Sequence, residues 1–372
     1  MTKIKLSAIS GAILATSMLF SQANATTIAL DYDPAEFADA KGQQALAGFQ
    51  QAANYWEWLF SDQITVNLNI SFAALDPNVI GQTGSSSAVF LYQDLAFALI
   101  DDVTSVGDLS AVNNLTCEDQ GVGVCAVSFL DNETDGTDGA VPGLDNDGSG
   151  DNYAFSINQA NAKALGFTAD SFGGAFSDSD GSVTFSSNFA FDFDRTDGID
   201  SDKMDFIGVA IHEIGHALGF TSGVDLYDVI YNSGGYPGLD LDPYAIASTL
   251  DLFRYSADSV AEGVGVLDWR PGADSYFSID GGQTNLGDFS TGSYGGDGRQ
   301  ASHFKDNLGL GIMDPTFSFG EYGKVSDLDK VAFDVIGWDL YSATGVPEPT
   351  TIAIFGLALA GLASSRRRSL KK

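Results

Sequence analysis

Residues 204–220 read Met-Asp-Phe-Ile-Gly-Val-Ala-Ile-His-Glu-Ile-Gly-His-Ala-Leu-Gly-Phe, and this stretch determines the predicted fold. Its apolar residues recur at helical spacing, Asp202 or Asp205 can cap its start, and Gly219 is placed to end it. The stretch therefore predicts a helix. Residues 212–216 form the pattern HExxH, in which the two histidines are about one helical turn apart and share one face.

The HExxH pattern predicts a zinc site. On a helix, His212 and His216 can bind one Zn²⁺, and Glu213 can reach a water on the metal as general base. A catalytic zinc takes three protein ligands and keeps a fourth position open. The chain has 3 histidines, so His303 is the remaining histidine and our predicted third ligand. Asp225 is the alternative third ligand, because carboxylates also bind zinc.

These motifs resemble those of the metzincin zinc metalloproteases. Residues 212–220 are similar to the start of the metzincin zinc motif, and Ile312-Met313-Asp314-Pro315 is similar to its Met-turn. The usual metzincin has its third histidine where this chain has Ser222. In the leishmanolysin-like branch a long insertion comes first, and the third ligand lies just before the Met-turn, as His303 does here. The stretch 329–338 also resembles the terminal helix of that branch.

The resemblance, which covers about residues 200–340, implies a fold and an activity. The fold would be α+β, with a mixed twisted sheet, an active-site helix and a long insertion before the third zinc ligand. An N-terminal subdomain (26–220) would carry that helix, and a C-terminal subdomain (221–345) would carry the Met-turn. Met313 would pack beneath the metal, and Tyr322 is a candidate donor to the oxyanion.

The implied activity is zinc-dependent endopeptidase action on protein or peptide substrates. The alternative is a non-catalytic surface or biofilm-matrix protein that keeps a protease-like fold stabilised by calcium and zinc. An intact Glu213 favours the enzyme, because a scaffold has no need of a general base.

Other elements follow from periodicity and capping. We predict strands at 28–32, 64–72, 183–185 and 189–193, helices at 43–60, 92–100 and 326–336, and irregular structure from 221 to 300.

Both ends of the chain carry targeting signals. Residues 1–25 have the basic start, apolar core and small cleavage residues of a signal peptide. Residues 346–372 resemble the PEP-CTERM sorting signal: Pro-Glu-Pro, a short apolar segment (350–365) and an Arg cluster. That resemblance implies export, transient membrane contact through 350–365 and recognition by a sorting protease, so the protein would be secreted or bound to the envelope. A permanent tail anchor is the alternative.

The chain is strongly acidic, with a formal net charge of -33. Nucleic acid is therefore excluded as a partner. Asp145, Asp147, Ser149 and Asp151 space oxygen atoms around glycines and predict a Ca²⁺ loop, with a solvated acidic turn as the alternative. Asp131, Glu133, Asp135 and Asp138 could extend the same loop.

The two cysteines, Cys117 and Cys125, are predicted to form one disulfide in the oxidising environment outside the cytoplasm.

Overall fold

The structure, a computed structural model, describes residues 26–341 apart from 78, 119–122, 133–142, 173–175 and 237. The predicted signal peptide (1–25) and sorting segment (346–372) lie outside the described residues, as do Glu133, Asp135 and Asp138. Within the described ranges, no helix combines the length and apolar character needed to cross a membrane.

The described part of the chain mixes helices with several small sheets, so the predicted α+β class is confirmed. In chain order its elements are β1 (Thr27–Asp31), α1 (Ala40–Leu59), β2 (Thr65–Ala73), β3 (Gly81–Ser85), β4 (Ser87–Leu91), α2 (Tyr92–Asp101), α3 (Val106–Asn113), β5 (Phe129–Asp131), β6 (Gly143–Asp145), α4 (Gly150–Tyr153), β7 (Ala154–Asn158), α5 (Gln159–Ala164), η1 (Ala169–Phe172), β8 (Gly181–Ser186), β9 (Phe191–Asp192), β10 (Met204–Asp205), α6 (Phe206–Ala217), α7 (Val224–Asn232), η2 (Thr249–Phe253), β11 (Arg254–Tyr255), α8 (Ala257–Glu262), β12 (Leu267–Asp268), β13 (Tyr276–Phe277), β14 (Gly287–Asp288) and α9 (Asp327–Val335).

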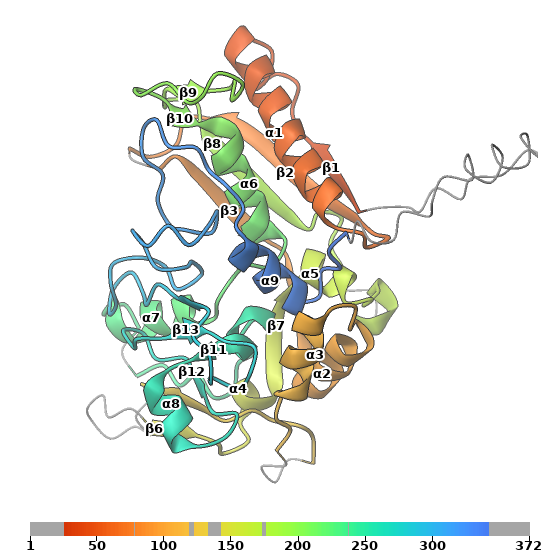
Figure 1. The fold of residues 1–372 in the computed structure, drawn as a ribbon, viewed down its shortest axis with the longest axis vertical. Coiled ribbons are helices and arrows are strands. Elements are labelled where there is room, and N and C mark those ends of the chain that lie inside the picture. The colour runs from red at the N-terminus through yellow and green to blue at the C-terminus, as the bar shows by residue number, and fades with distance from the viewer. Residues whose placement is uncertain are drawn as a thin grey trace, which may run out of the picture.

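The largest sheet has the strand order β1-β2-β8-β3. The first three strands are parallel, and β3 joins the edge in the antiparallel sense, so the sheet is mixed. Alternate residues of β2 are buried, as the period of a half-covered strand requires. Helices α1 and α6 lie side by side across one face of this sheet (Figure 1). Packing on the sheet therefore fixes the position of α6, the helix that carries His212 and His216.

Aromatic side chains fill the space between α1, α6 and the sheet. Phe49 and Phe206 meet edge to face, with ring centroids 5.2 Å apart, and Phe185 of β8 packs against both. The indole N–H of Trp56 donates to the Ile211 carbonyl of α6 at 3.0 Å. These contacts fix the position of α6 along α1.

The predicted helix over 204–220 begins later than expected. Met204 and Asp205 form the short strand β10, which pairs in parallel with β9, and α6 starts at Phe206. Of the two candidate caps, Asp205 accepts a hydrogen bond from the Gly208 N–H. Gly219 has φ 120°, a conformation that favours glycine and ends the helix.

The prediction that residues 221–300 are irregular is wrong. This segment contains α7, α8 and η2, the three strands of the sheet β11-β13-β14, and β12, which joins β5 and β6 in a second three-stranded sheet. Each of its strands is two residues long, too short to show a period of two in the sequence. The predicted strand over 189–193 is likewise reduced to the two residues of β9.

The other predicted helices and strands are present with small shifts of their ends. In addition, Cys117 and Cys125 are joined by a disulfide. The last helix, α9, has a capping box, in which Ser326 and Asp329 each accept a backbone N–H of the other.

We expect the Asp205 side chain to contribute strongly to the free energy of unfolding. Its buried carboxylate caps α6 and also accepts from Arg195 at 2.7 Å and from the Gly323 N–H at 2.9 Å. Asp205→Ala should lower the free energy of unfolding by about 3 kcal/mol or more, because it leaves the Arg195 guanidinium without its partner. Exposed Asp202 is the matched control, and Asp202→Ala should leave denaturant unfolding nearly unchanged. Equal losses in the two variants would contradict this role.

Candidate metal centre

Helix α6 presents His212 and His216 to the same point. Their Nε2 atoms are 3.1 Å apart, as expected for side chains one turn apart on a helix. His212 is buried and His216 is half-buried. The sequence spacing alone predicts this pair.

His303 completes the cluster from a loop far along the chain. Its Nε2 lies 3.0 Å from Nε2 of His216, although the two residues are 87 positions apart. The loop is held in place because the Ser290 N–H donates to the His303 carbonyl and the Phe304 N–H to the Met313 carbonyl. The structure therefore brings together the three histidines that the sequence predicts as ligands.

In each of the three rings, a backbone carbonyl faces Nδ1 and fixes the tautomer. Nδ1 lies 2.7 Å from the Ile312 carbonyl in His212, 2.7 Å from the Phe220 carbonyl in His216, and 3.2 Å from the Gln300 carbonyl in His303. A carbonyl can only accept, so each Nδ1 carries the proton and each Nε2 keeps a free lone pair.

The three Nε2 lone pairs fit a zinc ion. Nitrogens bound at 2.0–2.1 Å in a tetrahedral site would lie roughly 3.3 Å apart. The observed separations of 3.1 Å and 3.0 Å are close to that value. An all-imidazole set suits zinc, with copper, iron and nickel as further candidates by ligand chemistry.

Burial also keeps the imidazoles neutral. It lowers the pKa of His212 to about 4, and burial together with the neighbouring His212 lowers the pKa of His216 to about 4. The pKa of His303 is well below its usual value, again chiefly through burial. Neutral imidazole is the form that binds a metal.

Glu213 lies beside the histidines and faces strand β3. The Thr83 hydroxyl donates to its Oε2 at 2.7 Å. Burial raises the pKa of Glu213, while the nearby His216 and the Thr83 hydroxyl act against that rise. The sequence does not predict a role for Thr83. Its strand, β3, reads Gly-Gln-Thr-Gly-Ser and lacks the alternation of apolar residues by which a strand is recognised.

Met313 packs against α6, the helix that carries His212 and His216. It is fully buried, and a Cβ at Gly215 would lie 2.8 Å from its sulfur. Only glycine at position 215 lets this turn approach α6 so closely. Met313 is thus a packing contact of the helix, and its role as a Met-turn stays a prediction.

Asp225 is not part of the histidine cluster. Its carboxylate accepts the N–H of Ala301 at 2.6 Å, the N–H of Ser302 at 3.1 Å and the Ser302 hydroxyl. Both oxygens are engaged on the segment that precedes His303. In the structure, Asp225 supports the third histidine.

The predicted calcium loop is partly rearranged. Carboxylate oxygens of Asp145, Asp151 and Asp242 lie within 4.8 Å of one another. Burial raises the pKa of Asp145 to about 6 and that of Asp151 to about 7. Asp147 instead accepts the Ser149 N–H, and the Ser149 hydroxyl donates to Asp151. Asp242 was not expected, because it lies about ninety residues further along the chain, in the 221–300 segment. Calcium there stays a prediction.

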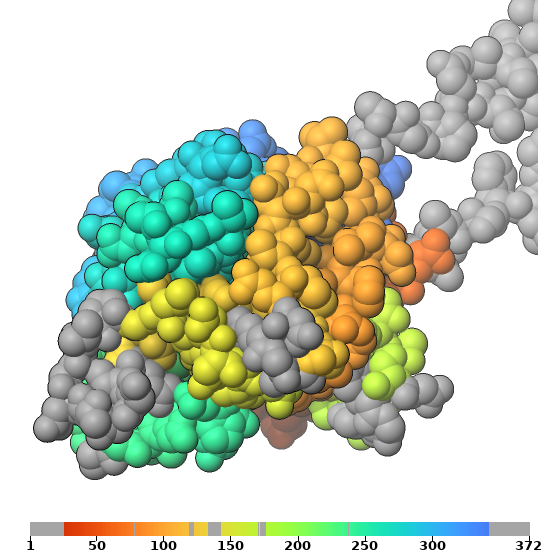
Figure 2. Space-filling view, turned by 90° about the horizontal axis from the view of Figure 1, so that it is seen from below, coloured from red at the N-terminus to blue at the C-terminus, as the bar shows by residue number. Residues whose placement is uncertain are grey.

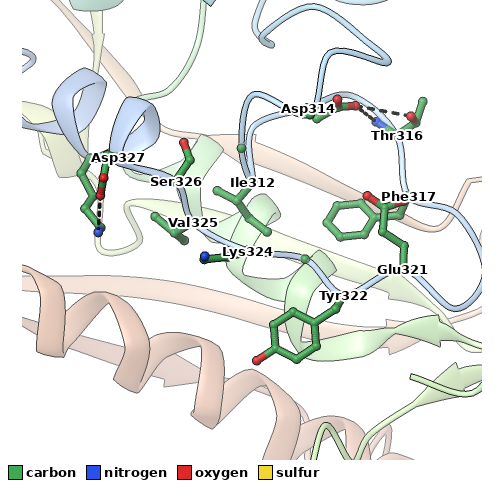
Figure 3. A pocket seen from close by; sticks show the side chains of 14 residues that line it. Ile312, Asp314, Thr316, Phe317, Glu321, Tyr322, Lys324, Val325, Ser326 and Asp327 are labelled. Carbon is green, nitrogen blue, oxygen red and sulfur yellow. Dashed lines mark hydrogen bonds and ion pairs between the residues drawn. The ribbon is translucent and has the colours of Figure 1, made fainter. Parts of the chain in front are cut away.

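Residues of the segment 309–330 line a pocket of about 500 Å³ (Figure 3). Ile312 and Phe317 line it and also contact His212, whereas Lys324 and Ser326 line it near the start of α9. Tyr322 is a further lining residue, and its ring stacks on the Arg195 guanidinium at 3.7 Å. Arg195 therefore covers one face of the Tyr322 ring, whose hydroxyl is the candidate oxyanion donor.

Comparison with known proteins identifies the tail. Residues 345–368 match the PEP-CTERM protein-sorting motif. No curated protein and no solved structure matches the chain. The motif implies export, association with the membrane or envelope through the C-terminal segment, and processing by a sorting protease (exosortase).

The identity of the third ligand can be tested by zinc binding. His303→Ala should lower the zinc affinity by more than about 100-fold, because it removes a ligand. Asp225→Asn should lower it by about 10-fold, the scale of a lost supporting contact. Competition with a chromophoric chelator measures both constants. A larger loss in Asp225→Asn than in His303→Ala would assign the ligand to Asp225.

Zinc should also be retained at unusually low pH. A proton and the metal compete for the same Nε2 lone pair, so affinity falls only as pH approaches the pKa of the metal-free site. With that pKa lowered to about 4 for His212 and His216, affinity should be nearly constant from pH 8 to 6 and fall below about pH 5. A fall that begins near pH 6.5, the ordinary histidine pKa, would contradict the burial of the site.

Proposed function

We propose that the protein is an exported zinc-dependent endopeptidase. The single observation that carries the proposal is the convergence of three neutral histidine Nε2 atoms next to a carboxylate, that of Glu213. The order of motifs resembles the leishmanolysin-like metzincins, and the placement of Met313 under α6 supports that comparison.

His212, His216 and His303 would hold the zinc. When bound, the ion would supply Lewis acidity to a water and to the scissile carbonyl. Three neutral ligands suit this task, because they leave the charge of the ion largely uncompensated.

Glu213 would act as the general base. Burial makes its carboxylate a stronger base than an exposed glutamate, so it can accept the proton of the attacking water and pass it to the leaving amine. Thr83 donates to Oε2, so Oε1 would be the oxygen that accepts the proton. A Cβ at Gly81 would lie 3.1 Å from Oε1, so glycine keeps that side of the carboxylate open.

The neighbouring edge strand supports an extended peptide as substrate. β3 ends the four-stranded sheet and, among the described strands, pairs on one side only, with β8. Its free side offers backbone N–H and C=O groups next to Glu213, and extended peptides bind such edges by adding a strand.

The sorting tail sets where the protein acts. Export and envelope association suit an enzyme that cuts extracellular or envelope proteins, and suit equally a non-catalytic matrix protein. A folded, zinc-loaded protein that cleaves nothing would favour the second function.

The test compares the zinc-loaded protein with Glu213→Gln on a diverse peptide mixture read by mass spectrometry. We expect cleavage by the parent and a fall of at least about 100-fold in kcat/KM in the variant, because proton transfer by a positioned base contributes that much. Zinc content is the control and should be unchanged, since Glu213 is not a ligand. Equal cleavage by both proteins would reject Glu213 as the base.

A further inference from the structure

Large apolar side chains are exposed on the neighbouring helices α2 and α3. Phe97 and Ile100 on α2 are 58% and 48% exposed, and Val106 and Leu109 on α3 are 88% and 50% exposed. In each pair the residues are three positions apart, so they share one face of their helix. The two helices pack against each other. We call these four residues the α2–α3 patch.

The core does not need the exposed side of α2. Its buried face is formed by Tyr92, Leu95 and Leu99, which already anchor the helix to the body. Phe97 and Ile100 are additional apolar residues on the other side, and a helix that is apolar on both sides is typical of one that is covered on both. The α2–α3 patch is therefore a candidate interaction surface.

The end of the described chain is held at the turn between these two helices. The Thr104 hydroxyl donates to Asp339 Oδ1 at 2.5 Å, and the Tyr341 N–H donates to the Leu59 carbonyl at 2.8 Å. Val106 follows this turn directly, and Ile100 lies just before it. The last described residues reach the surface beside the orange α2–α3 region in Figure 2. Whatever follows Tyr341 thus starts next to the patch.

The apolar segment of the tail is within reach of the patch. Residues 342–349 connect Tyr341 to the segment 350–363. A chain of that length spans at most about 30 Å, which exceeds the roughly 15 Å length of α2. A short linker of this kind gives an effective concentration on the order of 1 mM, so even a weak contact within one chain is populated.

The tail also complements the surroundings of the patch in charge. After the apolar segment come Arg366, Arg367 and Arg368. The chain has no Lys or Arg from 42 to 162, and Asp94 and Asp101 of α2 are exposed. The same aspartates would repel an anionic bilayer, and a second copy of the body brings the same acidic charge. Charge therefore favours the tail of the same chain as the occupant.

We propose that the apolar segment 350–363 packs on the α2–α3 patch of its own chain, with the three arginines beside the exposed aspartates of α2. Docking would shield the segment from water while the chain is outside the membrane. The tail would leave the patch when a bilayer takes up the segment, and processing by the sorting protease would uncover the patch. The inference rests on the sorting motif and not on the peptidase proposal, because no histidine takes part in it.

Photo-cross-linking of the whole exported chain, residues 26–372, tests the contact directly. The substitution Phe97→benzoylphenylalanine places a photoreactive ring in the patch. After irradiation in buffer without detergent, we expect cross-links from position 97 to 350–363 of the same copy, identified by mass spectrometry in the monomer band.

Phe319 offers a matched control position, since it is as exposed as Phe97. The N–H of the next residue, Gly320, donates to the carbonyl of Lys203, just before β10, and β10 lies well away from α2 and α3 (Figure 1). Phe319→benzoylphenylalanine should give at least about 10-fold fewer cross-links to the tail, because linker length alone favours neither position this strongly.

Three results would overturn the proposal. Equal yields at positions 97 and 319 would show that the tail has no preferred site. Cross-links from position 97 to a second copy would make the patch an interface between copies. Cross-links to lipid after addition of phosphatidylethanolamine–phosphatidylglycerol vesicles, with none to 350–363 in buffer, would assign the patch to the membrane.

Trypsin cleavage after Arg366, Arg367 and Arg368 measures the fraction of undocked tail. The double variant Ile100→Ser, Val106→Ser should be cut at least about 10-fold faster than the parent, because the protease acts on the open form and the variant loses apolar contact. Both residues are exposed, so the Tm should stay nearly unchanged. The matched control Leu226→Ser, Val264→Ser changes residues of similar exposure outside the patch and should be cut at the parent rate. Equal rates in the two double variants would also reject the docking.

Discussion

The arrangement of the histidine cluster depends on one buried carboxylate, that of Asp329. Fully buried at the start of α9, it accepts the N–H groups of Ile312 at 2.8 Å and Met313 at 3.2 Å, and caps its own helix through Ser326. This fixes the turn whose Ile312 carbonyl orients His212 and whose Met313 carbonyl holds the strand segment after His303. Because one anion satisfies several backbone donors at once, the positions of His212 and His303 follow from it.

Helix α6 is held on its other sides by indole N–H groups and by close packing. Trp56 of α1 donates to the Ile211 carbonyl, and Trp338, after α9, donates to the Leu218 carbonyl at 2.9 Å. Gly215 lets the Met313 side chain touch the helix backbone. These contacts come from both ends of the chain, so the histidine pair is rigid only when the whole described body has folded. A site held in this way needs little reorganisation when a metal binds.

Local patterns predict the parts of the fold that are long or capped, and the chemistry that has a fixed spacing. The α6 pattern, the Ser326 capping box and the small number of histidines together predict the helix, its histidine pair and His303. Thr83 and Asp242 could not be predicted, because their positions depend on pairings between distant segments. The same holds for 221–300, whose two-residue strands pair with residues as remote as Phe129. Zinc and catalysis themselves remain predictions.

Not all of the acidic residues lie on the surface, because several aspartates are buried in the structure. A formal charge of -33 by itself indicates a soluble surface. In the structure, however, Asp62, Asp108, Asp151 and Asp334 are buried, and burial raises the pKa of three of them into the neutral range. A carboxylate of this kind favours the folded state only when a proton or a cation accompanies it. By linkage, these aspartates therefore cost the fold stability as the pH rises from the ordinary aspartate range toward their raised pKa values.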